Sequence, residues 1–501
     1  MRIVVVGGGV SGLAAARLLA GGRAVSGAGA DSEGAFGPCR VVLLEASGRL
    51  GGKVRTSAGD TAFELGPDQF LKRDPSVVNL CRHLGLGGEL VEPAAGTAAV
   101  FARQAPRQLP SGLVLGVPTD VEALAASGIV SDEAVAFAAG EAARPGHELS
   151  AAEVGLDNDG GAGAERSVGD VLRPRLGDEI VDRLTDPLLG GINAGSVDAL
   201  SLGTTAPQLA TALVGHSDVM APLAALAPRR PEGPAAPGSP QTGDARSGSR
   251  PKTPGPSPFF GLVGGLGRMI DALALELTGL GCEVRLNSPV GRISQKDGGY
   301  AVSTAAGELQ ADAVVLAVPA FVAAELLGEL APAAASALGS IRYATVAVAT
   351  LAYEKGARAA LEGWTGVLIP KSEGALATAV TFLSHKWPFM PGVFVRVSAG
   401  RHLDDRIAGL GDTALAGRLV DELATYAGIA ATPSGVAVTR WERSFPQYEP
   451  GHGQRIARCR QALASHPAVA LAGASLGGIG IPACVTSGER AVAELLARLS
   501  R

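Results

Sequence analysis

The chain opens on a pattern of apolar runs and glycines that predicts a strand, a turn, a helix and a second strand. Residues 3–6 form an uninterrupted run of β-branched residues, residues 12–20 are helix formers, and residues 41–45 form a second apolar run. A continuous apolar run is typical of a strand in a parallel sheet that is covered on both faces. The pattern therefore predicts a βαβ unit at the N-terminus.

Helical and strand patterns then follow one another along the chain. Residues 76–225 have a mainly helical pattern, and in residues 178–184 the apolar positions recur at helical spacing. Further strands are predicted at residues 283–286, 290–294, 313–318 and 345–352, one helix ends near Gly279, and others span residues 413–427 and 487–498. A mixed α/β fold with a helical insert in the middle is expected.

Two segments interrupt this pattern. Residues 21–39 are rich in Gly, Ala and Ser, and we expect a mobile surface insertion there. Residues 228–258 contain nine Pro and five Gly, and no apolar residue larger than Ala. Because such a segment cannot bury enough surface to offset its ordering entropy, we expect a disordered loop.

Composition and charge exclude several classes of protein. With 47% hydrophobic and 18% charged residues, the 501-residue chain is too apolar to be disordered as a whole. Its net charge of −5, without a dense block of Lys and Arg, argues against a nucleic-acid binder that neutralises phosphates. Its five cysteines include no Cys-x-x-Cys pair, so neither a zinc site nor a disulfide framework is expected, and no metal is assigned.

The N-terminus, the cysteines and the longest apolar stretch predict the cellular location of the protein. The chain begins directly in an apolar strand without a secretory signal, and its cysteines fit a reducing cytosol, so we expect a cytoplasmic protein. The longest apolar stretch, residues 313–324, contains Pro319 and is shorter than the about 20 residues that a membrane span takes. No transmembrane span is expected, while peripheral membrane contact stays open.

The first turn carries a dinucleotide fingerprint, Gly7-x-Gly9-x-x-Gly12, between a predicted strand and a predicted helix. The first glycine allows the tight turn, the second lets a pyrophosphate approach the backbone, and the third allows close helix packing. The partner acid is Glu45, 33 residues after Gly12 instead of the usual 20 or so, because the 21–39 insertion intervenes. A carboxylate there binds ribose hydroxyls and disfavours the 2′-phosphate of NADP.

Two further segments extend the nucleotide site. Glu45-Ala46 is followed by Arg49, Gly51, Gly52 and Lys53, which offer a guanidinium and bare backbone amides to a second phosphate, as the long cofactor FAD requires. Gly66-Pro67-Asp68 forms a fixed turn whose backbone fits an isoalloxazine ring, although a plain β-turn explains these three residues equally well.

Together these motifs resemble the amine-oxidase-like flavoprotein superfamily. Residues 186–195 (DPLLGGINAG), 109–113, 445–452 and 473–482 are similar to segments of the oxygen-dependent protoporphyrinogen and coproporphyrinogen III oxidases of Gram-positive and actinobacterial type. The resemblance runs from residue 1 to about residue 495, apart from the two insertions. Asn193 departs from it, because an aromatic residue, typically Tyr, is expected there.

The resemblance implies an enzyme of heme biosynthesis. Such an oxidase holds FAD noncovalently and converts coproporphyrinogen III to coproporphyrin III in three two-electron steps, with O2 as acceptor and H2O2 as by-product. Protoporphyrinogen IX as main substrate is the first alternative. More distant alternatives are an amine oxidase, a carotenoid-type desaturase and a flavin-binding partner protein without turnover. The implied partners are the porphyrinogen, O2 and other enzymes of the pathway.

The resemblance also implies a Rossmann-like FAD-binding domain and a discontinuous substrate-binding domain. The expected division is 1–75, 259–320 and 465–501 for the FAD-binding domain, 76–227 for a helical substrate- or membrane-facing domain, 228–258 for the loop, and 321–464 for the substrate-binding sheet.

The remaining site residues come from the same resemblance. Cofactor contacts are expected from Val290, Gly473, Ile479, Gly480 and Ile481, beside the glycine and acid motifs above. Because the flavin itself accepts the hydride, no catalytic side chain is assigned.

Three side chains are candidates for a role beside the flavin: Lys72 and Arg73 for pairing substrate carboxylates or tuning the flavin edge, and Asn193 for the pocket wall. Two solvated charges explain Lys72 and Arg73 equally well. His452 fits a structural hydrogen bond better than catalysis, and Cys484 fits a small buried thiol better than a covalent flavin link.

Overall fold

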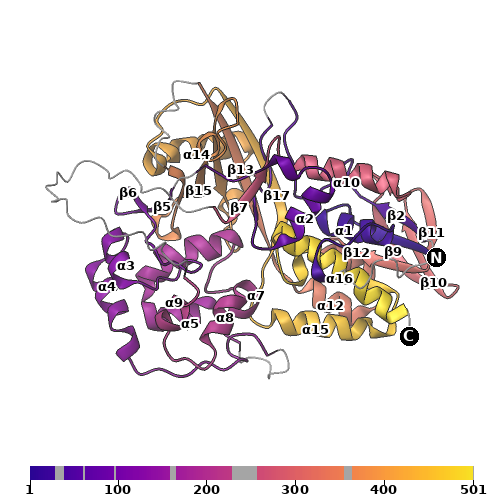
Figure 1. The fold of residues 1–501 in the computed structure, drawn as a ribbon, viewed down its shortest axis with the longest axis horizontal. Helices are drawn as coiled ribbons and strands as arrows, with labels where there is room; N and C mark the ends of the chain where they lie inside the picture. The colour runs from indigo at the N-terminus through magenta and orange to yellow at the C-terminus, as the bar shows by residue number, and fades with distance from the viewer. Residues whose placement is uncertain are drawn as a thin grey trace.

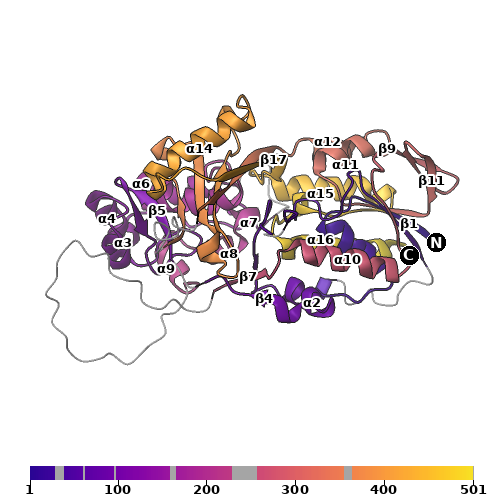
Figure 2. The same cartoon turned by 90° about the horizontal axis from the view of Figure 1, so that it is seen from above.

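The computed structural model describes residues 1–28, 39–59, 62–94, 97–157, 165–227, 257–354 and 364–499. They form an elongated molecule with a lobe of helices at one end and a lobe containing both chain ends at the other (Figures 1 and 2). Most of the 21–39 insertion and nearly all of the 228–258 loop lie outside the described residues, so the predictions for them are not tested here.

A parallel five-stranded sheet forms the centre of the lobe with the chain ends, in the order β18-β12-β1-β2-β8. Ile3 of β1 pairs with Ala313 on one side and with Val41 on the other. The strands span Arg2–Val6 (β1), Arg40–Leu44 (β2), Glu283–Arg285 (β8), Ala313–Leu316 (β12) and Val469–Leu471 (β18). The βαβ opening is confirmed, because β1 and β2 are parallel and flank helix α1 in the chain.

Helix α1 lies in the middle of this lobe. It spans Val10–Leu19, and every one of its residues is buried. It packs on α16, Ile481–Leu499, and on α10, Gly267–Gly279. The approach is close, since a Cβ at Gly488 of α16 would lie 2.2 Å from the Ser11 oxygen. Helix α16 begins six residues before the predicted start, because Pro482 is tolerated in a first turn.

The described start of the 21–39 insertion is anchored to α16. The Val25 and Ser26 amides each donate a hydrogen bond of 2.8 Å to the carboxylate of Glu489, which is only 1% exposed. A buried carboxylate thus binds the first residues of the insertion, and the predicted mobility of the insertion stays a prediction.

A second layer completes this lobe. Leu326, Leu338 and Ile456 belong to the same hydrophobic core as β1 and α1. They come from the helices α11 (Ala320–Leu327), α12 (Pro332–Gly339) and α15 (His452–Ala462). The lobe also contains a three-stranded antiparallel sheet of β9 (Val290–Lys296), β10 (Gly299–Thr304) and β11 (Gly307–Ala311). Parts of residues 321–464 thus share a core with the five-stranded parallel sheet. The predicted division into domains remains a prediction.

A seven-stranded sheet connects the two lobes, in the order β17-β13-β16-β15-β14-β5-β6. Leu415 and Leu419 of α14, Asp412–Ala427, share a core with Val395 on one face of this sheet. The strands span Thr97–Ala102 (β5), Ala105–Gln108 (β6), Tyr343–Tyr353 (β13), Trp364–Leu368 (β14), Ala377–Phe382 (β15), Val393–Ala399 (β16) and Gly435–Pro446 (β17).

Strands β5 and β6 correct the expectation of a mainly helical pattern in residues 76–225. Ala99 and Phe101 face the core under α14, whereas Val100 and Ala102 face the core of the helical lobe. Because both faces of β5 are buried, its sequence has no alternation of polar and apolar residues that would indicate a strand.

The helical lobe consists of short helices around a second core (Figure 1). Its longest regular segment is the π-helix η4, Val181–Gly190, which contains Pro187 and includes much of the predicted 178–184 helix. The other elements are α3 (Val121–Ser127), α4 (Asp132–Ala139), α5 (Val168–Leu176), α6 (Asp178–Ile180), α7 (Leu202–Thr205), α8 (Pro207–Leu213) and α9 (Met220–Ala224).

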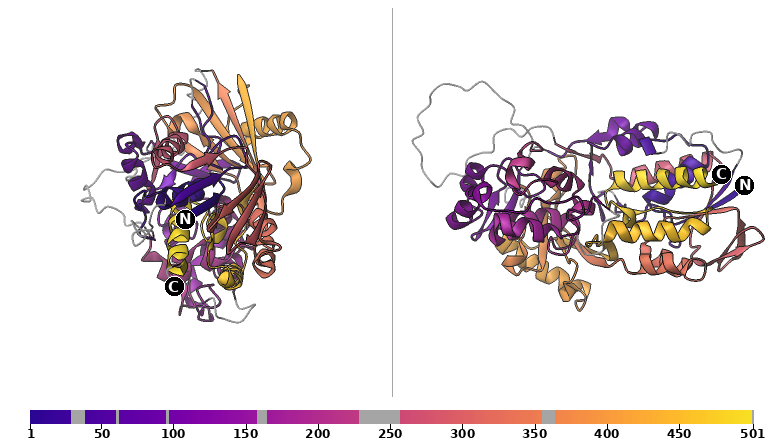
Figure 3. Two further views of the ribbon diagram at one scale, coloured as in Figure 1. Left: turned by 90° about the vertical axis from the view of Figure 1, so that its right-hand side faces the viewer. Right: turned by 90° about the horizontal axis from the view of Figure 1, so that it is seen from below.

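A small antiparallel sheet, β3-β7-β4, lies between the two lobes. Its strands span Phe70–Leu71, Phe259–Leu262 and Leu90–Val91, and helix α2 spans Pro75–His83. Both chain ends lie at the same end of the molecule (Figure 3). Among the helices of the described ranges, none combines the length and the apolar character that crossing a bilayer requires.

Replacing residues 228–256 by a short Gly-Ser linker is expected to leave the melting temperature nearly unchanged, because this segment offers no large apolar side chain to a core. Ser257 and Pro258 are kept, since the Ser257 amide donates to Glu92 and the Pro258 carbonyl accepts from Lys72. A large drop in melting temperature, measured by calorimetry, would contradict the prediction.

Candidate functional site

The turn between β1 and α1 is built on glycines. Gly7 has a φ of +105°, which L side chains rarely adopt, and its amide donates to the Leu44 carbonyl. A Cβ at Gly12 would lie 1.9 Å from the Gly7 oxygen. Both residues are therefore needed for the turn itself, as the fingerprint predicts.

Gly9 differs from its neighbours because open space surrounds it. A Cβ there would have only the Gly52 Cα near it, at 4.0 Å. Gly9 is the N-cap of α1 and provides no side-chain cap, so the first amides of the helix remain available to an anion. The fold therefore leaves a bare backbone cradle at the positive end of α1, which fits a pyrophosphate.

Glu45 is fixed at the end of β2, directly beside this cradle. Its Oε2 accepts a 2.7 Å hydrogen bond from the Gly8 amide, and its Oε1 accepts from the amide and hydroxyl of Ser47 at 2.8 and 2.7 Å. These bonds orient the carboxylate next to the glycine turn, where the ribose acid of a dinucleotide site is required. Ala46 lies between Glu45 and Ser47.

The segment after Glu45 returns to the turn. Gly51 forms a bridge with Gly9, and Gly51 and Gly52 have φ values of +98° and +57°. The Arg49 guanidinium donates to the carbonyls of Leu50 and Gly52, and burial lowers its pKa. Arg49 therefore holds the Gly51–Gly52 turn in place, and its predicted phosphate contact remains a prediction.

Lys53 and Cys484 connect this segment to the glycines near the C-terminus. The Lys53 side chain is exposed, yet surrounding protein lowers its pKa, and the charge of the Cys484 thiolate would raise it. The Cys484 Sγ lies 3.9 Å from the Gly478 oxygen and 4.0 Å from that of Ile479, and burial raises its pKa. A thiol kept protonated in this way is a poor nucleophile.

Gly473 begins the second glycine segment and has a φ of +129°. Its amide donates to the Ser487 hydroxyl at 3.0 Å, which ties the end of β18 to α16. Gly480 precedes Ile481, the first residue of α16, and Ile479 lies beside Cys484. Val290, at the start of β9, is half-buried.

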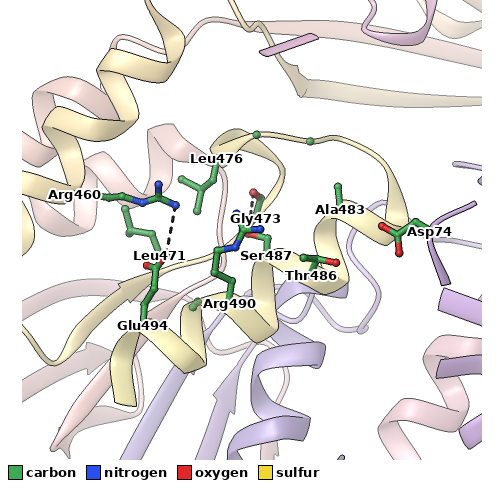
Figure 4. Close-up of a pocket in the computed structure, with 13 residues that line it drawn as sticks. Asp74, Arg460, Leu471, Gly473, Leu476, Ala483, Thr486, Ser487, Arg490 and Glu494 are labelled. Carbon is green, nitrogen blue, oxygen red and sulfur yellow. Dashed lines mark hydrogen bonds and ion pairs between the residues drawn. The ribbon is translucent and has the colours of Figure 1, made fainter. Parts of the chain in front are cut away.

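A pocket of about 230 Å³ lies between this glycine segment and α16 (Figure 4). Arg490, Ser487 and Thr486 project from α16 along one wall. Of the predicted flavin-site residues, only Gly473 lines it. The glycine cradle at Gly9, not this pocket, has the chemistry that a dinucleotide needs.

Asp68 is the centre of a buried ionic cluster. Its carboxylate accepts from Lys386 Nζ at 2.6 Å and from Trp387 Nε1 at 3.2 Å, and lies 3.8 Å from Arg396 Nη1. Burial alone would raise the pKa of Asp68, but the charges of Lys386 and Arg396 outweigh it and hold that pKa well below its usual range. Sequence reasoning missed Lys386 and Arg396, which carry no motif.

The Gly66-Pro67-Asp68 turn lies against the seven-stranded sheet. Trp441 of β17 donates from Nε1 to the Leu65 carbonyl at 2.8 Å. A Cβ at Gly66 would lie 2.0 Å from the Lys53 oxygen, so only glycine allows the turn and the Lys53 segment to approach this closely.

The other two charged candidates, Lys72 and Arg73, have partners of their own. Lys72 Nζ lies 2.6 Å from Glu92 and 5.3 Å from the centre of the Phe260 ring. Arg73 donates to Gln208 at 3.3 Å. Their role in carboxylate pairing remains a prediction.

Asn193 is buried at the end of η4. Its Nδ2 donates to the Leu189 carbonyl at 2.9 Å, and its own carbonyl accepts from Gln447 at 3.1 Å. The side chain thus closes the turn after the π-helix, and its assignment to a pocket wall remains a prediction.

His452 is a buried, neutral residue. Its Nε2 lies 2.9 Å from the Ser475 carbonyl, and its ring lies against Tyr448. Burial first, and the charge of Arg455 second, lower the pKa of His452 to about 4. This geometry favours the structural interpretation of His452.

The depressed pKa predicts a loss of stability in acid. Because the unfolded chain binds a proton near pH 6.5 and the folded one only near pH 4, the free energy of unfolding falls as the pH falls through this window. We expect His452→Gln to remove about 2 kcal/mol of the loss between pH 7.5 and 5.0. Urea unfolding at both pH values measures it, and equal losses in the two proteins would contradict the assignment.

Known proteins resemble this chain along its whole length. Residues 10–496 match the family described as flavin containing amine oxidoreductase. A coproporphyrinogen III oxidase of Bacillus subtilis is 31% identical and one of Mycobacterium tuberculosis 33% identical, each over 99% of this chain and over 98% and 97% of the relative. A solved putative protoporphyrinogen oxidase from Exiguobacterium sp. 255-15 is 29% identical with a TM-score of 0.81, and the match covers 100% of this chain and 99% of that one.

Proposed function

The chain belongs to the flavin containing amine oxidoreductase family, and on that basis we propose that it oxidises coproporphyrinogen III to coproporphyrin III with FAD and O2. Membership makes it an oxidoreductase with a flavin cofactor. The observation that supports the substrate assignment is that relatives named coproporphyrinogen III oxidase match 99% of the chain at 31% and 33% identity. The solved structure named a putative protoporphyrinogen oxidase from Exiguobacterium supports protoporphyrinogen IX as the alternative substrate.

The glycine cradle supports FAD as the flavin. Gly9 and Gly52 leave room for a pyrophosphate at the first amides of α1, and Glu45 is oriented to accept hydrogen bonds from ribose hydroxyls. The Lys53 segment and the turn at Gly66 continue the site towards the seven-stranded sheet. Val290, Gly473, Ile479, Gly480 and Ile481 are proposed as the remaining contacts.

When bound, the flavin accepts the electrons and returns them to O2. Six electrons and six protons leave the porphyrinogen, and three O2 become three H2O2. The chain's own residues bind and orient: the cradle would hold the cofactor, and Lys386 and Arg396 fix the Asp68 carboxylate beside the Gly66 turn. We also propose a cytoplasmic location, with peripheral membrane contact and contact with other heme-pathway enzymes as further proposals.

Noncovalent binding predicts that acid precipitation releases all the yellow colour into the supernatant. The physical reason is that the partly buried Cys484 thiol beside Gly478 and Ile479 stays protonated, because its pKa is raised. Absorbance of pellet and supernatant measures the result. Colour that stays with the pellet would contradict the proposal and point to Cys484.

Initial rates on the two porphyrinogens test the substrate. We expect faster oxidation of coproporphyrinogen III than of protoporphyrinogen IX at equal concentration, followed by porphyrin fluorescence and by H2O2. A reversed order would make protoporphyrinogen IX the substrate. A yellow protein that oxidises neither would contradict the proposed function.

A further inference from the structure

Arg396 is a largely buried arginine in a strand whose neighbouring residues belong to an apolar core. It lies on β16 between Val395 and Val397, which belong to the apolar core under α14. Because neighbouring side chains of a strand point to opposite faces, Arg396 lies on the other face of the sheet. The side chain is only 14% exposed.

The Arg396 guanidinium has unused hydrogen-bonding capacity. Its Nε and Nη1 are buried and, within the described residues, have no hydrogen-bond partner. The nearest acid, Asp68, is 3.8 Å from Nη1, beyond hydrogen-bond distance, and is already bound by Lys386 and Trp387. Buried polar atoms normally have partners, so two donors on one side chain without a partner in the described part of the protein are available to bind an acceptor.

The charges of the cluster lead to the same conclusion. Asp68 neutralises one of the two cations, Lys386 and Arg396, so one positive charge remains. Glu64 also interacts with Arg396, but burial raises its pKa to about 7. Its oxygens are bound by the Leu266 amide and the Thr56 hydroxyl. A buried excess cation is costly unless an anion reaches it.

A hydroxyl group lies next to the guanidinium on the same face. Thr350 of β13 pairs directly with Arg396 in the antiparallel register, is only 4% exposed, and its Oγ1 has no hydrogen-bond partner among the described residues. Side chains of directly paired residues lie about 5 Å apart on one face. A guanidinium beside a hydroxyl matches the two oxygens of a carboxylate.

This face of the sheet is also the face that meets the proposed flavin turn. Val346 and Trp441, which are paired across β13 and β17, share a small apolar cluster with Ala194. Trp441 bonds to Leu65, the residue before Gly66. Arg396 therefore faces the region between the flavin turn and the end of η4.

We propose that Arg396, assisted by Thr350, binds a carboxylate of the substrate and so selects tetrapyrroles that carry propionates. This inference rests on the proposed function and makes it more specific. It replaces Lys72 and Arg73 as the first candidates for this role, because these two already contact Glu92 and Gln208.

The test compares an acid with its ester on the FAD-loaded protein. Binding of coproporphyrin III and of its tetramethyl ester is titrated by quenching of porphyrin fluorescence, which needs no turnover. Arg396→Gln is expected to weaken binding of the acid by roughly 10- to 100-fold, the size of a lost charge-assisted hydrogen bond, and to leave the ester unchanged. Thr350→Val is expected to weaken binding of the acid by roughly 5-fold.

Two controls separate a binding role from a structural one. Arg396→Lys keeps the positive charge but loses the planar set of guanidinium N–H donors, and is expected to bind the acid with intermediate affinity. Arg418→Gln removes an exposed arginine of α14, on the opposite side of the sheet, and is expected to change nothing. The acid-to-ester ratio within each variant is independent of any difference in its folded fraction.

The outcomes distinguish a failure of the carboxylate-binding inference from a failure of the proposed function. Equal weakening of acid and ester, or no weakening, in Arg396→Gln overturns the inference and leaves the proposed function standing if the wild type oxidises coproporphyrinogen III. A wild type that binds coproporphyrin III without oxidising its porphyrinogen overturns the proposed function alone. A wild type that does not bind coproporphyrin III overturns both.

Discussion

Gly9→Val is expected to give a folded protein without yellow colour. The backbone of Gly9 is extended, with φ −73° and ψ 175°, and its Cβ position is open, so valine fits the fold. Its branched side chain would fill the cradle between Gly9 and Gly52 and keep a pyrophosphate from the first amides of α1. Loss of even one charge-assisted hydrogen bond weakens FAD roughly 10- to 100-fold, and blocking the whole cradle weakens it further.

The measurement is flavin absorbance per protein, together with circular dichroism to verify the fold. Gly417→Val is the matched control, because Gly417 in α14 also has open space around its Cβ position but lies far from the cradle in the chain. It is expected to retain full flavin. A folded Gly9→Val protein with full flavin content would show that the cofactor does not lie at this turn.

Asp186→Ala is expected to destabilise the fold by about 3–5 kcal/mol, the usual result of removing one partner of a buried ion pair. Asp186 Oδ2 accepts from Arg401 at 3.0 Å, and both side chains are nearly fully buried. Its Oδ1 accepts from the Val197 amide at 3.0 Å. The substitution therefore leaves both a buried guanidinium and a buried amide without their acceptor.

Urea unfolding of the two proteins measures this loss. Asp178→Ala is the control, because Asp178 is 79% exposed and pairs with Arg173 at the surface, where such pairs contribute little. A loss in Asp186→Ala no larger than in Asp178→Ala would contradict the role given to the buried pair.

The glycine turn and Glu45, the nucleotide half of the candidate site, could be predicted from the sequence because their signals are local. Gly7, Gly9 and Gly12 form one turn, and the strand before it and the helix after it are continuous in the chain. Glu45 was recognisable despite its unusual spacing, since the second apolar run ends at it. Each of these positions is fixed by backbone geometry, which a short motif specifies.

The charged cluster around Asp68 could not be predicted in this way. Lys386 and Arg396 meet Asp68 across more than 300 positions of sequence. Lys386 comes from the short helix α13, Leu383–Lys386, and Arg396 from β16, so only the tertiary fold brings both to Asp68. Lys72 has the charge expected of a binding residue, but the small sheet places it beside Glu92. Strand β5 gave no period-two pattern because it is covered on both faces.

The most direct test of the central claim is aerobic turnover of coproporphyrinogen III by the purified yellow protein, with porphyrin and H2O2 quantified in the same sample. We expect coproporphyrin fluorescence that rises with enzyme concentration and three H2O2 formed for each coproporphyrin III. A protein that retains its flavin yet produces no coproporphyrin above the rate of air oxidation would contradict it.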